Sequence, residues 1–595
     1  MDQRLDRNRF TLKEKSGQRC SQRPPSTRML LLWLAPVLFL ILFYLYPLGS
    51  ILSVGLSRSL GGAISTFRQA FASAYLWRVA GFTVWQATLS TALTLLLGLP
   101  GAFLLARYEF RGKGLVQVLA SIPFVMPTLV VAAGFNALLG PRGWINLAAM
   151  SWFNLSAPPI HFVNTLTAIL VAHVFYNLTI VLRMVGDFWS HLDPRISQAA
   201  QVLGANRWQT LWRITFPLLL PAIAAAALLV FIFDFTSFGV ILVLGGPRYA
   251  TLEVEIYYQT ISLFNLPLAA TLSLLQLGST LGLTVLYTHL SRRLTRPLSL
   301  HPQRQTQRRL VSGRSRILAT AFIMILLSLQ ITPLAALVAR SFLRAGGDRR
   351  AASVIAPQFT LQYYRELSIN QRAALFYAPP TTAMAVSLAY ALSTVILALA
   401  LGLPAAWALS REPQQSAPIV ATANKLLDPL LMLPLGTSAV TLGLGFIIAL
   451  GCPPLNLRAS PVLVPLAHTL VAFPFVVRSL TPALRSIRPR LRQAAAVLGA
   501  SPGQVIWYID LPLVGRAVLV AAIFAFTISM GEFGATALIA RPEYPTIPIM
   551  IYRFLSQPGA LNYGQALALS TILMLVTAGG MLAIERFRIA EVGEF

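Results

Sequence analysis

Long runs without charged residues dominate this chain. Each run lies between two charged residues, and seven of them are bounded by Arg28 and Arg58, Arg78 and Arg107, Lys113 and Arg142, Glu255 and Arg292, Arg372 and Arg411, Asp428 and Arg458, and Arg553 and Glu585. Because roughly 20 apolar residues cross a bilayer as a helix, each run can hold one span. With the shorter runs included, the pattern predicts about twelve spans, near residues 30–54, 82–106, 116–139, 163–185, 217–243, 267–290, 316–340, 382–409, 427–450, 462–481, 512–539 and 564–584.

Composition agrees with this pattern. Of 595 residues, 56% are hydrophobic and only 11% are charged, which is outside the range of soluble globular proteins. The first apolar run is longer than a signal peptide and lacks a small-residue cleavage site, so we expect it to be a retained helix. The sequence therefore predicts an all-α polytopic membrane protein.

The net charge of +28 raises the possibility of nucleic-acid binding, but its distribution favours a membrane. If the N-terminus is cytoplasmic, most of the 47 Lys and Arg residues fall in the inner segments, as the positive-inside rule requires. We therefore expect both termini in the cytoplasm of a cell (inner) membrane. The basic arm 1–29 and the linker 291–315 are expected to lie on anionic lipid headgroups, so the predicted partner is the lipid bilayer and not nucleic acid.

Motifs for catalysis, cofactors or metals are missing from the sequence. The two cysteines, Cys20 and Cys452, are predicted on opposite sides of the membrane, which does not indicate a disulfide or a metal site. The one Gly-Lys pair, Gly112-Lys113, is followed by Gly114 and so does not form a nucleotide-binding GxxxxGK[ST] loop. We expect no enzymatic activity, no cofactor and no metal, and an energy source in a partner protein.

The chain repeats itself. The stretch QAAQVLGANRWQTLWRITFP, residues 198–217, returns as QAAAVLGASPGQVIWYIDLP, residues 493–512, with eleven of twenty positions identical at a shift of 295. Upstream, Gly98-Leu99-Pro100 matches Gly402-Leu403-Pro404 at a slightly different shift. A repeat with an even number of spans returns to the same side, so the two copies are parallel. We predict two six-helix halves, residues 30–290 and 316–585, joined by the linker 291–315 and followed by a cytoplasmic tail 586–595.

Each copy of the repeated stretch lies between the fourth and fifth spans of its half, in loops near 193–217 and 488–512. Two alanines and a leucine fall on one helical face, and a glycine, Gly204 or Gly499, is placed to end or bend the helix. A second amphipathic stretch then leads to Pro217 or Pro512, which are expected to begin the next membrane helix. A small, smooth helix outside the bilayer, present once per half, suits a docking site for a partner. The alternative reading is an ordinary interfacial loop helix.

The repeated stretch closely resembles a family signature. The pattern Glu-Ala-Ala, three residues, Gly, nine residues, Ile-x-Leu-Pro is typical of permease subunits of binding-protein-dependent ABC importers, in which this loop forms the coupling helix that docks on the ATPase. The resemblance assigns ATPase coupling to Gln198, Ala199, Ala200, Gly204, Ile214, Pro217, Gln493, Ala494, Ala495, Gly499, Ile509, Leu511 and Pro512. This chain departs from the pattern at Gln198 and Gln493, which replace the acidic residue, and at Phe216. Gln can hydrogen-bond but cannot form a salt bridge to the ATPase.

The fusion of two such halves is similar to the permeases for thiamine and for ferric iron. Stretches that suggest the thiamine permeases are YLWRVA (75–80), AHVFYNL (172–178) and LGGPRYATLEVEIY (244–257), although they also suit the iron permeases. The resemblance implies a type I importer permease fold and ATP-driven alternating access for a small solute. It also implies two partners, a cytoplasmic ABC ATPase homodimer and an extracytoplasmic solute-binding protein. Thiamine and ferric iron both remain open as the cargo.

A few polar residues fall within the predicted spans. Asp234 and Glu532 do not occupy equivalent repeat positions, since Ser237 is the counterpart of Glu532, whereas His173 and His468 are equivalent. Charges at membrane depth often serve function, so these four residues are candidates for the translocation path. The alternative for the carboxylates is a structural hydrogen-bonding role, and for the histidines helix–helix hydrogen bonding is favoured over contact with cargo.

The rival function is an ion-coupled secondary transporter. It predicts inverted repeats or several intramembrane carboxylates, whereas the sequence indicates parallel repeats and two such carboxylates. A membrane-embedded enzyme is disfavoured because the sequence offers no catalytic constellation, and a scaffold would not need two matching loops.

Overall fold

The computed structural model describes residues 27–57, 73–294, 307–309, 313–344, 358–369, 378–410, 427–451 and 456–592. Most of the basic arm and linker lie outside the described residues, as do Cys20, Cys452 and residues 593–595 of the tail. The elements of the first half are α1 (Thr27–Leu40), η1 (Ile41–Leu45), α2 (Tyr46–Ser57), α4 (Ala74–Arg107), β1 (Tyr108–Glu109), α5 (Lys113–Leu119), α6 (Ile122–Val125), α7 (Thr128–Leu139), α8 (Trp144–Phe153), α9 (Leu166–Ser190), α10 (Pro194–Val202), α11 (Arg207–Thr210), η2 (Leu211–Thr215), α12 (Phe216–Phe235), η3 (Ile241–Gly245), η4 (Pro247–Tyr249), α13 (Leu252–Tyr257), η5 (Tyr258–Ser262) and α14 (Leu266–Leu294).

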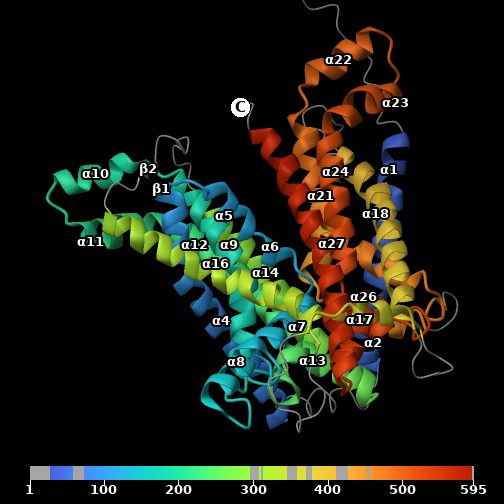
Figure 1. The fold of residues 1–595 in the computed structure, drawn as a ribbon. Coiled ribbons are helices and arrows are strands. Elements are labelled where there is room, and N and C mark those ends of the chain that lie inside the picture. Colours follow the sequence, from blue (N-terminus) through green and yellow to red (C-terminus); the bar gives the residue numbers. More distant parts are fainter. Residues whose placement is uncertain are drawn as a thin grey trace, which may run out of the picture.

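The remaining elements repeat this order (Figure 1). They are β2 (Arg308–Arg309), which pairs with β1, then α16 (Gly313–Ser341), α17 (Gln362–Arg365), η6 (Glu366–Ser368), α18 (Pro380–Ser410), η8 (Leu433–Gly436), α20 (Ala439–Ala449), α21 (Leu463–Ser486), α22 (Pro489–Val497), α23 (Pro502–Val505), η9 (Ile506–Asp510), α24 (Leu511–Gly531), α25 (Thr536–Ile539), α26 (Ile547–Leu555) and α27 (Ala560–Val592). Apart from short β pairings, the described chain is helical.

Ten helices in the described residues are long and apolar enough to cross a membrane, and two bent helix pairs raise the total to twelve. The predicted spans at 116–139 and 427–450 are bent helix pairs in the structure. The first is a pair, Lys113–Val125 and Thr128–Phe153, bent by 107°, and the second is Leu427–Gly436 and Ala439–Ala449, bent by 100°. Figure 1 places α5 beside β1 and α8 at the opposite end, so the first bent pair still carries the chain across.

Local chemistry explains both bends. In the first pair, Met126 and Pro127 have extended backbones, since proline lacks an amide donor and restricts the residue before it. In the second pair, the Ser438 hydroxyl accepts hydrogen bonds from the amides of Val440 and Thr441. That arrangement caps a new helix rather than continuing the old one.

The predicted fifth and eleventh spans, 217–243 and 512–539, have different ends in the structure. Their helices run over Arg207–Phe235 and Gly503–Gly531. Pro217 and Pro512 lie in the first turn of α12 and α24, as expected, but these α-helices continue longer helices that begin in the repeated loops. A π-helical turn, η2 or η9, directly precedes each α12 or α24 segment, and the amide of Phe216 or Leu511 bonds five residues back. Such a wide turn fits a site where proline interrupts the regular ladder.

The first helix of each half packs against the opposite half. The α1 and α2 helices contact α18 and α20, whereas α16 contacts α7 and α27, and Figure 1 shows α1 beside α18 and α16 beside the elements of the first half. Two equivalent contacts, one from each half, hold these helices against the opposite half. A Cβ on Gly134 would lie 2.9 Å from the Pro333 carbonyl oxygen, and one on Gly445 would lie 3.0 Å from Pro47. The glycines therefore permit close helix approach.

The two halves also meet just after α12 and α24, the helices that follow the repeated loops. The rings of Phe238 and Phe533, which are equivalent positions, stack with centroids 5.5 Å apart. Each ring is flanked by a tyrosine from its own half, Tyr257 or Tyr552. A second contact between the halves is the ion pair of Arg183 in α9 with Glu585 in α27. The halves are therefore joined at more than one place along the helices.

Candidate functional site

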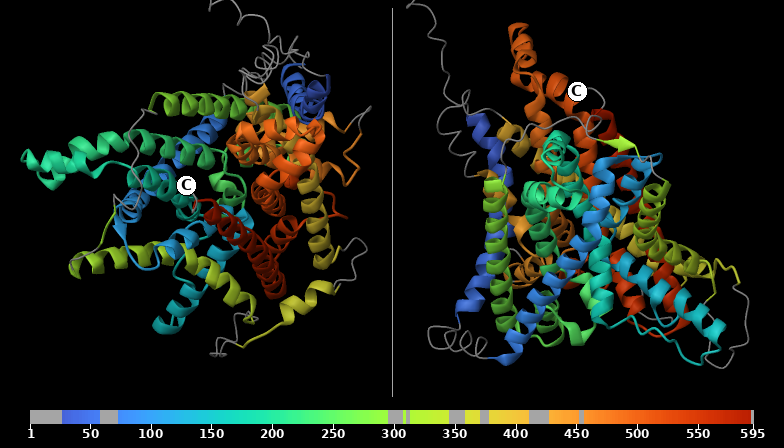
Figure 2. Two further views of the ribbon diagram at one scale, coloured as in Figure 1. Left: turned by 90° about the horizontal axis from the view of Figure 1, so that it is seen from above. Right: turned by 90° about the vertical axis from the view of Figure 1, so that its left-hand side faces the viewer.

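The repeated loops project from the same end of the molecule. In Figure 1, α10 and α11 lie at the upper left and α22 and α23 at the upper right. Viewed from above in Figure 2, the two loops lie on opposite sides of the C-terminal end of α27. The halves are therefore parallel, and their main bodies diverge toward the loops.

Both loop helices end in the same way. Gly204 has φ 91° and Gly499 has φ 86°, a left-handed conformation that favours glycine. The amide of Ala205 bonds to the Ala200 carbonyl, and the amide of Gly204 bonds to the Gln201 carbonyl. The second loop repeats both bonds at equivalent residues. This is the Schellman arrangement, and it forces each chain to turn sharply after α10 or α22, as the glycine pattern predicts.

The turn leaves apolar side chains in the open. Val202 and Leu203 are 87% and 88% exposed, and Val497 and Leu498 are both 87% exposed. Trp208 and Trp507 nearby are also exposed. Paired apolar side chains exposed at the tips of two related loops indicate contact surfaces for a partner.

The residues that the sequence assigns to coupling occupy several environments. Eight of them are exposed, namely Gln198, Ala199, Gly204, Pro217 and their counterparts Gln493, Ala494, Gly499 and Pro512. Ala200 is buried, and Ala495, Ile214, Ile509 and Leu511 are half-buried. The exposed group can reach a partner, and the others support the fold of the loop. The exposed Val-Leu pairs are not part of the family pattern, although each pair lies within a copy of the repeated stretch.

The loops differ in how they are anchored. In the second half, Asp510 accepts a hydrogen bond from the Trp407 indole at 3.0 Å and pairs with Arg492 at 2.7 Å. These three residues join α18, α22 and η9. The equivalent positions in the first half are Phe103, Thr215 and Ser197, which cannot form this network.

The candidate path residues of the first half form a closed network. His173 contacts Ser90 and Asp234 through Nδ1, at 3.0 and 3.2 Å, and Ser237 through Nε2 at 2.9 Å. The Asn177 amide donates to Asp234 at 2.7 Å. His173 and Asp234 are both buried. The network joins α4, α9 and the end of α12.

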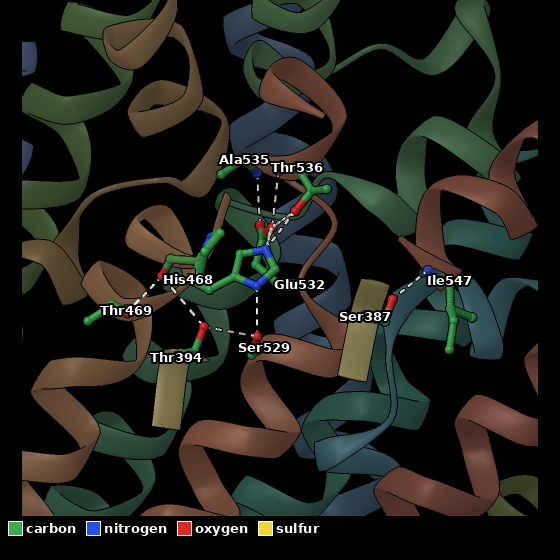
Figure 3. A network of polar contacts seen from close by, with 10 residues as sticks. Ser387, Thr394, His468, Thr469, Ser529, Glu532, Ala535, Thr536 and Ile547 are labelled. Atoms are coloured by element: carbon green, nitrogen blue, oxygen red, sulfur yellow. Dashed lines mark hydrogen bonds and ion pairs between the residues drawn. The ribbon is translucent and has the colours of Figure 1, made fainter. Parts of the chain in front are cut away.

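The second half contains the corresponding network, shown in Figure 3. His468 contacts Ser529 through Nδ1 at 2.8 Å, and contacts Thr536 and Glu532 through Nε2 at 2.8 and 3.2 Å. Glu532 also accepts hydrogen bonds from the amides of Ala535 and Thr536. It thereby caps the short helix α25.

The two networks are related by an exchange of side chains. Asp234 and Ser529 are equivalent and contact Nδ1, whereas Ser237 and Glu532 are equivalent and contact Nε2. Each half thus combines one histidine, one carboxylate and one serine. This explains why the carboxylates are out of register in the sequence. Their partners favour helix–helix bonding, and a role in the translocation path stays a prediction.

The exchange predicts a compensating pair of substitutions. Replacing Glu532→Ser leaves buried His468 without its carboxylate partner, and the loss of a partner by a buried polar group costs about 1–3 kcal/mol. Adding Ser529→Asp to that variant should restore much of the lost stability, because the new carboxylate meets Nδ1 as in the first half. The temperature at which the purified protein loses its monodisperse gel-filtration peak measures this. A double variant no more stable than Glu532→Ser would contradict the exchange.

The sequence reasoning missed several other buried carboxylates, among them Glu253 and Glu255. Glu253 accepts hydrogen bonds from Gln276 and, across the halves, from Ser438, while Glu255 accepts one from the Tyr75 hydroxyl at 2.7 Å. Burial raises the pKa of Glu253 to about 8. The available signal was the stretch LEVEIY, where two acidic residues interrupt an apolar sequence between spans.

Comparison with known proteins agrees with the architecture. Residues 98–296 match the family model "Binding-protein-dependent transport system inner membrane component". The thiamine transport system permease protein of Escherichia coli is 28% identical over 512 residues, covering 84% of this chain and 88% of that protein. The Brucella abortus (strain 2308) protein of the same name is 29% identical, covering 90% and 92%.

A Sinorhizobium fredii protein named as a probable ABC transporter permease is 24% identical, covering 88% of this chain and 89% of that protein. The similarity to these relatives extends across both halves. Residues 98–296 thus match the importer family model, and the chain as a whole, with its parallel repeats and matching loops, resembles the fused thiamine permeases over most of its length.

Proposed function

We propose that this permease carries thiamine into the cytoplasm, driven by a separate ATPase. The chain resembles two permeases named for thiamine transport over at least 84% of its own length. Those names support thiamine over ferric iron as the cargo. In this proposal the cargo is delivered by an extracytoplasmic binding protein and moves between the two halves.

The observation that carries the proposal is the pair of matching loops at one end of the molecule. Each loop presents an exposed Val-Leu pair next to a left-handed glycine. Two equivalent surfaces suit two copies of one partner, and we assign them to the subunits of an ATPase homodimer. Gln198 and Gln493 would contribute hydrogen bonds rather than salt bridges at this contact.

The packing of the halves suggests how closure of the ATPase would act. The halves touch at Phe238 and Phe533, just after α12 and α24 end. Their bodies diverge toward the loops. Drawing the loops together would rock the halves about their contacts and separate the aromatic stack. Rigid-body rotation about an interface is a known route of coupling between distant sites. The resulting alternation would expose the cargo first to one side and then to the other.

The test is ATP hydrolysis in proteoliposomes that contain the permease, its ATPase and its binding protein. Binding protein loaded with thiamine should stimulate hydrolysis and support thiamine accumulation, whereas empty binding protein or one loaded with ferric iron should not. Thiamine accumulation driven by a proton gradient without ATP would favour the secondary-transporter alternative. Stimulation by ferric iron instead of thiamine would overturn the cargo while retaining the transporter class.

A further inference from the structure

A cavity of about 880 Å³ lies between α4 and the first repeated loop. Its size is within the range of small-molecule sites. Two rows of residues, each with a spacing of four, form its facing walls. The first row, along α4, is Leu95, Leu99, Phe103 and Arg107, and the second, along η2 and α12, is Leu211, Thr215, Leu219 and Ile223. Because residues four apart share a helix face, both rows run from the loop end into the apolar part of the spans.

The mouth of the cavity is basic and aromatic. Arg107 and Arg207 line it together with Trp208 and Trp212, and none of the lining residues is Asp or Glu. The wall also contains Trp189, which is 6% exposed and whose indole N–H has no hydrogen-bond partner in the described structure. A buried donor without a partner is costly. The cavity therefore offers positive charge at one end and an apolar channel at the other.

In the second half, the side chains at equivalent positions bond to one another. There Trp407, Asp510 and Arg492 form the network described above. Their counterparts Phe103, Thr215 and Ser197 all line the cavity. The arginine and tryptophan at 207 and 208 are also particular to the first half, since Pro502 and Gly503 replace them. The first half thus lacks this network. Basic and aromatic side chains line the mouth of its cavity instead.

We propose that this cavity binds one acidic phospholipid from the leaflet on the side of the repeated loops. The phosphate would meet Arg107 and Arg207, since guanidinium groups bind phosphate oxygens well. An acyl chain would lie between the leucine rows of α4 and α12. Tryptophans at the mouth match the usual position of these side chains at the membrane interface. The bound lipid would connect the first loop to α4 where the second loop uses its own side chains. This inference does not depend on the identity of the cargo.

The test is retention of phosphatidylglycerol by the full-length purified permease after exchange into detergent with excess phosphatidylcholine, measured by mass spectrometry. Wild type should retain phosphatidylglycerol selectively. Arg107→Gln with Arg207→Gln should reduce retention by about thirtyfold, because each basic residue near an anionic headgroup contributes about a fivefold gain. Arg213→Gln is the matched control, since it removes one exposed charge from the same segment but does not line the cavity, and it should retain the lipid.

A second variant closes the cavity instead of removing its charge. Phe103→Trp, Ser197→Arg and Thr215→Asp together transfer the network of the second half and should also expel the lipid. In wild type, phosphatidylglycerol but not phosphatidylcholine or inorganic phosphate should raise the unfolding temperature, a readout that needs no variant. Equal retention in wild type and the double arginine variant would overturn the proposal. Displacement of the lipid by inorganic phosphate would also overturn the proposal. Displacement of the lipid by bound ATPase would overturn it as well, and would assign the cavity to the ATPase.

Discussion

Replacing Gly204 and Gly499 together with valine is expected to abolish coupled uptake in proteoliposomes while leaving the permease folded. Both glycines have positive φ, and an added Cβ would meet no atom within 4 Å. The effect would therefore come from backbone strain and not from a clash. A side chain in the left-handed region costs roughly 1–2 kcal/mol, and valine is unsuited to it because of its branched Cβ. The loop would relax by changing the direction of the turn after α10 or α22.

The expected loss is about tenfold per loop, because a cost near 1.4 kcal/mol changes a population tenfold, and both loops must dock at once. Gly112 supplies the control. It also has a left-handed backbone, φ 84°, with open space around it, but it lies between β1 and α5. Gly112→Val should show nearly normal uptake. If the loop variant and the control transport equally well, the loops do not couple ATP hydrolysis to transport.

The second large effect is expected from Leu203→Asp combined with Leu498→Asp. These leucines are almost fully exposed in the isolated permease, and burial of a leucine contributes about 1.5–3 kcal/mol. A carboxylate at each position would lose that contribution and would also carry a charge into an apolar contact. We expect the ATPase to fail to co-purify with this variant.

Leu263→Asp tests whether any exposed leucine would give the same result. Leu263 is also exposed and follows η5, at the end of the first half away from the loops. Its substitution should leave the complex with the ATPase intact. Co-purification of the ATPase with the Leu203→Asp, Leu498→Asp variant at wild-type yield would place the docking surface elsewhere.

Features encoded locally were predictable from the sequence. Uncharged runs of about 20 residues located the spans, since the bilayer requires that length. Gly204 and Gly499 marked the ends of the loop helices because the left-handed turn favours glycine. The repeat itself revealed that the halves are parallel. These conclusions depend on neighbouring residues or on direct comparison of two stretches.

Features that depend on distant contacts were not predictable. Nothing local to Pro47 or Pro333 indicates that each packs on a glycine of the opposite half. The apolar runs around Met126 and Ser438 conceal sharp bends, because hydropathy records composition and not backbone direction. The exchange of carboxylate and serine around His173 and His468 required three-dimensional positions. In the aligned sequences of the two halves, the carboxylates occupy different positions.

We expect both repeated loops to face the cytoplasm, where one ATPase dimer can bind them. Single cysteines at Leu203→Cys and Leu498→Cys, in a chain whose Cys20 and Cys452 are replaced by serine, test it directly with a membrane-impermeant maleimide. We predict that both cysteines react in inside-out vesicles and that neither reacts in right-side-out vesicles. Reaction of the two positions from opposite sides of the membrane would contradict it.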